Sequence, residues 1–175
     1  MTTRQLTLTA MLTALLCILG PLTLPLGPVP LSLTTAALMG MALLLGPARA
    51  ALCCTVYLLM GLVGLPVFSG FTGGMGVLLG PTGGFLLGYL PLTALCGVLC
   101  RGTESRGLHA LAFLLGTALL YLAGAAWYCR QSGAEASAAL AVCVLPFLPG
   151  DVLKILTVAL GGGSIRRRLR RAGLL

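Results

Sequence analysis

Charged side chains are scarce in this sequence. Only 8% of its 175 residues are Asp, Glu, Lys or Arg, three of these are acidic, and there is one histidine. Soluble domains carry about 25% charged residues, so this chain has too few to cover a surface in water. With 58% hydrophobic residues and a mean hydropathy of +1.08, the sequence predicts an all-α integral membrane protein that crosses the bilayer several times.

The same scarcity argues against an enzyme. A membrane-embedded enzyme needs clustered acid–base groups or metal ligands, yet Glu104 and Glu135 are expected on opposite sides of the membrane. Six of the seven cysteines lie in apolar runs, where cysteine behaves as a small hydrophobic residue. Cys96 and Cys100 are one helical turn apart, but a charged loop separates them from His109. We therefore expect no catalytic residues, no metal site and no cofactor.

Proline, glycine and charged residues divide the chain into apolar runs. Six of these are predicted to span the membrane, namely residues 5–19, 31–45, 48–65, 84–100, 108–128 and 150–165. Several are shorter than the ~20 residues that cross a bilayer, which a tight bundle tolerates. A seventh run, 136–148, is expected to form a short helix cut off by Pro146 and Pro149, because proline disrupts helix interiors.

The basic residues support an even number of spans. With both termini in the cytoplasm, the inner segments carry nine of the eleven basic residues, as the positive-inside rule requires: Arg4, Arg49, Arg101, Arg106, Arg166, Arg167, Arg168, Arg170 and Arg171. We interpret the C-terminal arginines as an anchor facing anionic lipid rather than a nucleic-acid site. The sequence thus predicts a multi-pass cell-membrane protein, with residues 1–175 forming one substrate-binding domain.

This topology places a pair of charges near the outer side of the last helix. Asp151 and Lys154 are three residues apart and share a helix face, although each charge costs ~2.5–3.5 kcal/mol near the bilayer centre. They either neutralise each other or, because Lys154 is misplaced at a helix start, bind an anion such as a carboxylate. The uncharged outer segments 20–30 and 66–83 are expected to fold over the bundle as lids.

Three further patterns have both a packing and a functional interpretation. Gly76, Gly80, Gly84 and Gly88 recur every four residues; such a stripe suits close helix packing, or a broken helix whose peptide groups bind a ligand. The Gly80–Gly84 region lacks the Gly-Lys-Ser/Thr ending of a phosphate-binding loop, so no ATPase activity is expected.

Small and aromatic residues give the other two patterns. Ala10 and Ala14 are one turn apart on the first helix and serve either bundle packing or docking of another membrane protein. Trp127 ends the fifth span and belongs either to an interfacial aromatic belt or to the wall of a ligand pocket.

Several motifs together resemble the BioY family, the biotin-binding S components of energy-coupling factor (ECF) transporters. They are Gly46-Pro47-x-Arg49, the glycine-rich block from Gly73 to Gly88, Tyr121-x-x-Gly124-x-x-Trp127, and Leu145-Pro146-Phe147-Leu148-Pro149-Gly150-Asp151-x-x-Lys154. The resemblance covers nearly the whole chain, and the glycine-rich and Pro-Gly-Asp-x-x-Lys blocks are highly specific.

The resemblance implies a six-helix protein that captures biotin from outside the cell and pairs with a transmembrane coupling subunit and cytoplasmic ATPases. Ala10 and Ala14 match the docking motif of the family. The implied biotin site comprises Asp151, Lys154, Phe71, Gly73, Gly74, Thr82, Gly83, Gly84, Phe85 and Trp127. Phe85 stands where the family often has tyrosine, which leaves a stacking contact but no hydroxyl. A solitary biotin carrier, or an S component for another vitamin, remains the alternative.

Overall fold

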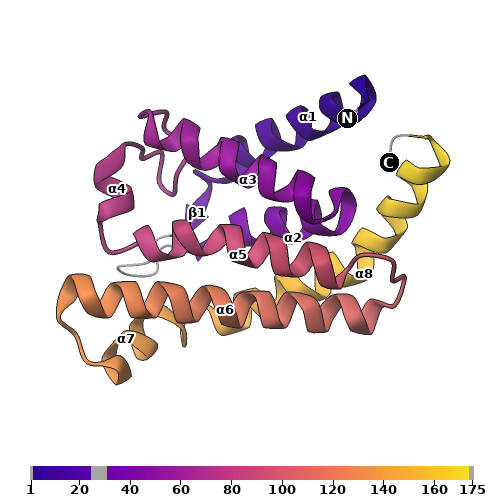
Figure 1. The fold of residues 1–175 in the computed structure, drawn as a ribbon. Coiled ribbons are helices and arrows are strands. Elements are labelled where there is room, and N and C mark those ends of the chain that lie inside the picture. The colour runs from indigo at the N-terminus through magenta and orange to yellow at the C-terminus, as the bar shows by residue number, and fades with distance from the viewer. Residues whose placement is uncertain (1, 25–30, 174–175) are drawn as a thin grey trace.

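The computed structural model describes residues 2–24 and 31–173, which form an almost wholly helical bundle (Figure 1). A two-stranded antiparallel hairpin, with Thr23 opposite Ser32, is the only sheet in this part of the chain. The elements are, in order, α1 (Thr3–Leu19), β1 (Thr23–Leu24), β2 (Leu31–Ser32), α2 (Thr34–Leu45), α3 (Pro47–Leu62), α4 (Met75–Leu79), α5 (Gly83–Leu99), α6 (Arg106–Ser132), α7 (Ala136–Cys143) and α8 (Leu148–Arg171).

The six long helices coincide with the six apolar runs, with shifted boundaries. The largest shift is in α8, which begins at Leu148, carries Pro149 in its first turn and continues to Arg171. The predicted short helix, α7, is separate from α8, but the break lies at residues 144–147 rather than at Pro149. α8 includes Pro149 because proline is well tolerated in the first turn of a helix. α7 ends at Cys143, before Pro146, and the five-residue α4 lies in a segment expected to be loop.

Local signals account for several helix ends. Thr2 and Gln5 form a reciprocal capping box at the start of α1, which satisfies backbone N–H groups that lack helical partners. Gly46, with a φ of 79°, ends α2 and leads directly into Pro47 at the start of α3. The left-handed backbone at Gly46 favours glycine, so the sharp turn between the two helices is encoded locally.

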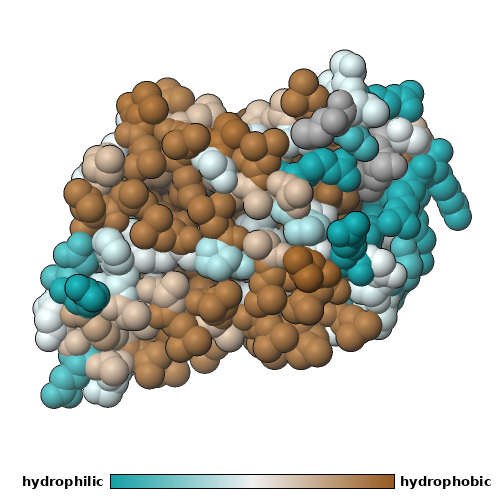
Figure 2. Space-filling view, in the orientation of Figure 1, coloured by the Kyte–Doolittle hydropathy of each residue, from teal (hydrophilic) through white to brown (hydrophobic). Residues whose placement is uncertain are grey.

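The outer surface of the bundle is apolar. Among residues 2–24 and 31–173, two helices, α6 and α8, are long and apolar enough to cross a membrane, and α1, α2, α3 and α5 are shorter apolar helices of 10–17 residues. Figure 2 shows a broad hydrophobic surface between hydrophilic patches at the two ends of the molecule. Such a large exposed apolar surface is typical of a membrane-facing protein, in agreement with the predicted class.

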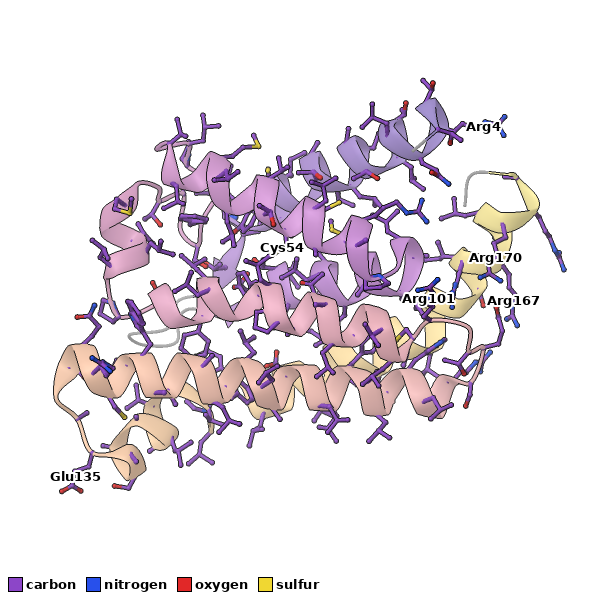
Figure 3. The ribbon with its side chains drawn as sticks, viewed as in Figure 1. Arg4, Cys54, Arg101, Glu135, Arg167 and Arg170 are labelled. Carbon is purple, nitrogen blue, oxygen red and sulfur yellow. The ribbon has the colours of Figure 1, made fainter. Side chains whose placement is uncertain are left out.

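Both described chain ends lie at the same end of the bundle (Figure 1), where Arg4 Nη1 donates to the Gly173 carbonyl oxygen at 3.0 Å. Arg101, Arg167 and Arg170 gather at this end, while Glu135 lies at the other (Figure 3). The hairpin, α4 and α7 also lie at the end away from the chain termini. The two ends of the bundle therefore differ. We name the one with the chain termini the arginine end and the opposite one the α4–α7 end.

Candidate functional site

Asp151 and Lys154 form an ion pair near the start of α8. Lys154 Nζ lies 2.7 Å from Asp151 Oδ1, and the two side chains are only 10% and 8% exposed. Tyr121 of α6 donates its hydroxyl hydrogen to Asp151 Oδ2, and Lys154 Nζ donates to Thr35 Oγ1 of α2 at 3.2 Å. Three helices therefore meet in one polar cluster, which we call the Asp–Lys cluster: Thr35, Tyr121, Asp151 and Lys154.

The cluster leaves part of the lysine available. An ammonium group has three N–H donors, and two of them are used by Asp151 and Thr35. Both oxygens of Asp151 already accept a hydrogen bond. The carboxylate thus holds the ammonium in place. The third N–H donor of Lys154 can bind a further acceptor that enters the neighbouring cavity.

A cavity of about 290 Å³ adjoins this cluster at the α4–α7 end. Its walls are largely apolar and aromatic, with hydroxyl groups from serine and threonine between them, a composition typical of small-molecule sites. Helices α2, α5, α6 and α8 contribute, together with the segment between α3 and α5. The lining residues are Ser32, Thr35, Phe68, Ser69, Thr72, Val77, Thr82, Phe85, Leu86, Tyr89, Leu120, Tyr121, Phe147, Asp151 and Lys154.

The segment after α3 is anchored beside the cavity by Phe68. This side chain is fully buried and meets the Tyr57 ring edge-on, with centroids 5.6 Å apart. Tyr57 donates its hydroxyl hydrogen to the Val67 carbonyl oxygen at 3.0 Å. A Cβ at Gly61 would lie 2.0 Å from the Phe68 ring, so glycine is needed there. Phe68 therefore holds Ser69 and Thr72 at the cavity.

Phe71 and the first two residues of the glycine-rich block, Gly73 and Gly74, do not line the cavity. Phe71 has a φ of 59° and is 67% exposed. Gly74 has a φ of 94° and donates its N–H to the Gly61 carbonyl oxygen at 2.7 Å. A Cβ at Gly73 would lie 2.4 Å from the Leu65 carbonyl oxygen. Gly73 and Gly74 thus allow the chain to fold back closely on the end of α3. The geometry gives Phe71, Gly73 and Gly74 no direct contact with the cavity.

The second part of the block divides between the cavity and a helix interface. Thr82 and Phe85 line the cavity. Gly83 and Gly84 instead lie against α6: a Cβ at Gly84 would be 2.2 Å from the Trp127 Cβ. The Trp127 indole donates to the Gly80 carbonyl oxygen at 2.9 Å and does not line the cavity. These contacts lock α4 and the start of α5 against α6.

Ala10 and Ala14 lie on the outward face of α1. Both are exposed, while Thr9, Thr13 and Leu16 face the bundle. The interpretation as packing residues inside the bundle is therefore wrong. The two alanines form a smooth stripe on the surface, at which another helix could approach closely.

Four of the ten expected site residues thus line one cavity: Thr82, Phe85, Asp151 and Lys154. Among the cavity residues that sequence reasoning missed are Thr35, Phe68, Thr72, Tyr89 and Tyr121. Tyr121 belongs to the Tyr-x-x-Gly-x-x-Trp motif, so that motif was the signal that could have found it. Thr35 lies 119 residues from its partner Lys154, and no local pattern connects them.

Comparisons with known proteins agree on one family. The family model described as the BioY family matches residues 1–171. The chain is 34% identical over 174 residues to a biotin transporter BioY2 of Lactococcus lactis subsp. cremoris, covering 94% of this chain and 91% of that protein. It is 33% identical over 157 residues to a biotin transporter BioY of Thermotoga maritima, covering 90% and 92%.

A solved structure supports the same assignment. The fold matches a crystal structure described as the S-component for biotin from an ECF-type ABC transporter. The TM-score is 0.89 at 30% sequence identity, and the match covers 95% of each chain.

Proposed function

The chain belongs to the BioY family, and from this premise we propose that it captures biotin as the substrate-specific subunit of an ECF-type vitamin uptake transporter. The observation that carries the proposal is the position of Lys154, whose ammonium group lies at the cavity wall with one donor beyond those used by Asp151 and Thr35. It is a binding subunit and not an enzyme.

The chemistry of biotin complements this cavity. Biotin has a flat ureido ring, an apolar thioether ring and chain, and one carboxylate. We assign the carboxylate to Lys154, because charge-assisted hydrogen bonds are the strong ones in a buried site. Phe68, Phe85 and Tyr89 supply aromatic surface for the rings. The Thr82 hydroxyl lines the cavity and is available to the ureido group. The Thr72 hydroxyl donates to the Ser69 carbonyl oxygen at 2.9 Å and is left to accept from a ureido N–H.

We propose that Phe71, Gly73, Gly74, Gly83, Gly84 and Trp127 act indirectly. The close backbone approaches at the glycines and the hydrogen bond of Trp127 fold the segment after α3 over the cavity and hold it against α6. Phe71 contributes the positive φ of the turn that precedes Gly73. In this arrangement residues 66–83 form one lid. Of the other expected lid, 20–30, the structure describes residues 20–24, where Gly20 ends α1 and Thr23–Leu24 form β1; residues 25–30 lie outside the described part.

We further propose six membrane spans, formed by α1, α2, α3, α5, α6 and α8, with both termini in the cytoplasm and residues 1–175 as one integral membrane domain. The grouping of Arg101, Arg167 and Arg170 with both described chain ends supports this orientation (Figure 3). The cavity then faces the outside of the cell. The exposed stripe of Ala10 and Ala14 is the proposed docking surface for a transmembrane coupling subunit, which links the chain to cytoplasmic ATPases.

Equilibrium binding to the purified full-length chain in detergent tests the proposal. Radiolabelled biotin, riboflavin and thiamine are titrated separately, and we expect saturable binding of biotin alone. Binding of riboflavin or thiamine in place of biotin would support an S component for another vitamin. Uptake into proteoliposomes is then measured with and without a coupling module. A solitary carrier would transport biotin without the module, whereas a transporter subunit would require it.

A further inference from the structure

A second cavity lies at the arginine end of the bundle, opposite the biotin site. Its volume is about 820 Å³, and four arginines line it: Arg49, Arg101, Arg166 and Arg170. None of the described residues that line it is acidic. The nearest recorded carboxylate contact is Glu104 to Arg170, at 3.9 Å between half-exposed side chains. The cavity is therefore strongly electropositive.

Arg166 is fixed as part of the cavity wall. It is 7% exposed, and its Nη1 donates to the carbonyl oxygens of Cys100 and Thr103, both at 3.1 Å. A guanidinium has five N–H donors, so the Nε and Nη2 groups are left after these two bonds. A buried cation held by neutral carbonyl groups keeps its charge uncompensated.

Arg49 gives the more specific signal. Its Nε donates to the Leu45 carbonyl oxygen at 3.0 Å, but its Nη1 is buried and has no hydrogen-bond partner among the described residues. Buried polar groups are nearly always paired, so such a group calls for an explanation such as an ion that completes the site. An anion in the cavity would supply both the acceptor and the charge.

The start of α3 adds backbone donors to the same place. Gly46, Pro47 and Ala48 line the cavity, and within the described part of the chain no side chain caps this helix. The first-turn N–H groups of Ala48 and Arg49 have no intrahelical partner, and the positive end of the helix dipole favours an anion. Two kinds of donor, guanidinium and backbone amide, thus converge on one space.

We propose that this arginine cavity binds a phosphate group. Guanidinium forks match phosphate oxygens in geometry, and helix N-termini bind phosphate through backbone amides. The phosphate comes either from the headgroup of an anionic lipid or from a soluble phosphate. Leucines 43–45 line the cavity beside the arginines, which gives the acyl region of a lipid an apolar wall. The inference does not depend on biotin binding.

The lipid arm of the test uses native mass spectrometry of the full-length chain with equimolar phosphatidylglycerol and phosphatidylcholine. We expect wild type to retain phosphatidylglycerol in excess, and Arg49→Gln to reduce this excess about tenfold, because a charge-assisted contact is lost. Arg167→Gln is the matched control: it removes the same charge from an exposed position of α8 outside the cavity and should change retention by less than about twofold.

The soluble arm measures thermal unfolding of the same proteins in detergent, with inorganic phosphate replacing chloride at constant ionic strength. A higher unfolding midpoint in wild type and Arg167→Gln, but not in Arg49→Gln, indicates soluble phosphate; an effect in the lipid arm alone indicates the headgroup. The proposal is overturned if wild type responds in neither arm. It is also overturned if Arg167→Gln loses as much lipid retention or phosphate stabilisation as Arg49→Gln. If Arg49→Gln does not elute as a monodisperse species, the responses of wild type to phosphatidylglycerol and to inorganic phosphate still decide whether the proposal stands.

Discussion

Tyr121 and Asp151 connect α6 to α8 through a hydrogen bond from the tyrosine hydroxyl to Asp151 Oδ2. The other carboxylate oxygen, Oδ1, accepts from Lys154 Nζ at 2.7 Å. The buried carboxylate is therefore satisfied on both sides before any ligand enters. Tyr121 positions Asp151, and Asp151 positions the ammonium group of Lys154.

The first prediction concerns this hydroxyl. Tyr121→Phe leaves Asp151 Oδ2 without its donor, and an unsatisfied buried acceptor costs about 1–3 kcal/mol. We expect a lower thermal unfolding midpoint in detergent and weaker biotin binding in an equilibrium assay. Tyr128→Phe is the control on the same helix, because the Tyr128 hydroxyl has no hydrogen bond recorded within the described ranges and the residue lies outside the cavity. Equal behaviour of the two variants would remove the positioning role.

The second prediction concerns Lys154. Lys154→Ala should weaken biotin binding tenfold or more, because a charge-assisted hydrogen bond contributes about 1.5–3 kcal/mol. Removing one partner of a buried ion pair also destabilises the protein, so affinity alone does not isolate the ligand contact.

The discriminating measurement for Lys154 is the affinity ratio of biotin to biotinamide, which lacks the carboxylate. Wild type should prefer biotin, whereas Lys154→Ala should bind both ligands about equally. A general loss of stability lowers both affinities and leaves their ratio unchanged. A variant that keeps the wild-type preference would show that the carboxylate binds elsewhere.

The sequence predicted the six main helices well because glycine, proline or charged residues mark where the apolar runs end. It missed α4, whose run Met75–Leu79 is short and bounded by Gly74 and Gly80. It also placed the end of α8 too early, because the arginines after Ile165 were interpreted as a tail. In the structure Arg166 is buried within that helix and donates to Cys100 and Thr103.

The site was predictable only where its residues are close in sequence. Asp151 and Lys154 lie on one helix, so their shared face follows from their spacing. Thr35 and Phe68 reach the cavity from distant segments, and only the packing of the helices brings them there. Gly83 and Gly84 were assigned to the ligand because a glycine pattern does not distinguish close approach to a ligand from close approach to Trp127.

The third prediction tests whether Gly84 serves close helix packing rather than ligand contact. Gly84→Ala should destabilise the protein by about 1–3 kcal/mol, because the new Cβ would lie 2.2 Å from the Trp127 Cβ and overpack the α5–α6 interface. Gly76→Ala is the matched control, since a Cβ there meets nothing within 4 Å. Thermal unfolding in detergent compares the two. A Gly84→Ala midpoint no lower than that of Gly76→Ala would contradict the close helix contact.

The fourth prediction concerns the stripe on α1. Ala10→Trp and Ala14→Trp should leave biotin binding unchanged, because both positions are exposed and lie outside the cavity. They should abolish ATP-dependent uptake, since a bulky side chain prevents close approach of a partner helix. Binding to the purified chain and uptake by cells expressing the coupling module are measured in parallel. Ala118→Trp, at an exposed alanine of α6, controls for bulk on the lipid-facing surface and should transport normally. If the α1 variants also transport at the wild-type rate, the coupling subunit does not dock on this stripe.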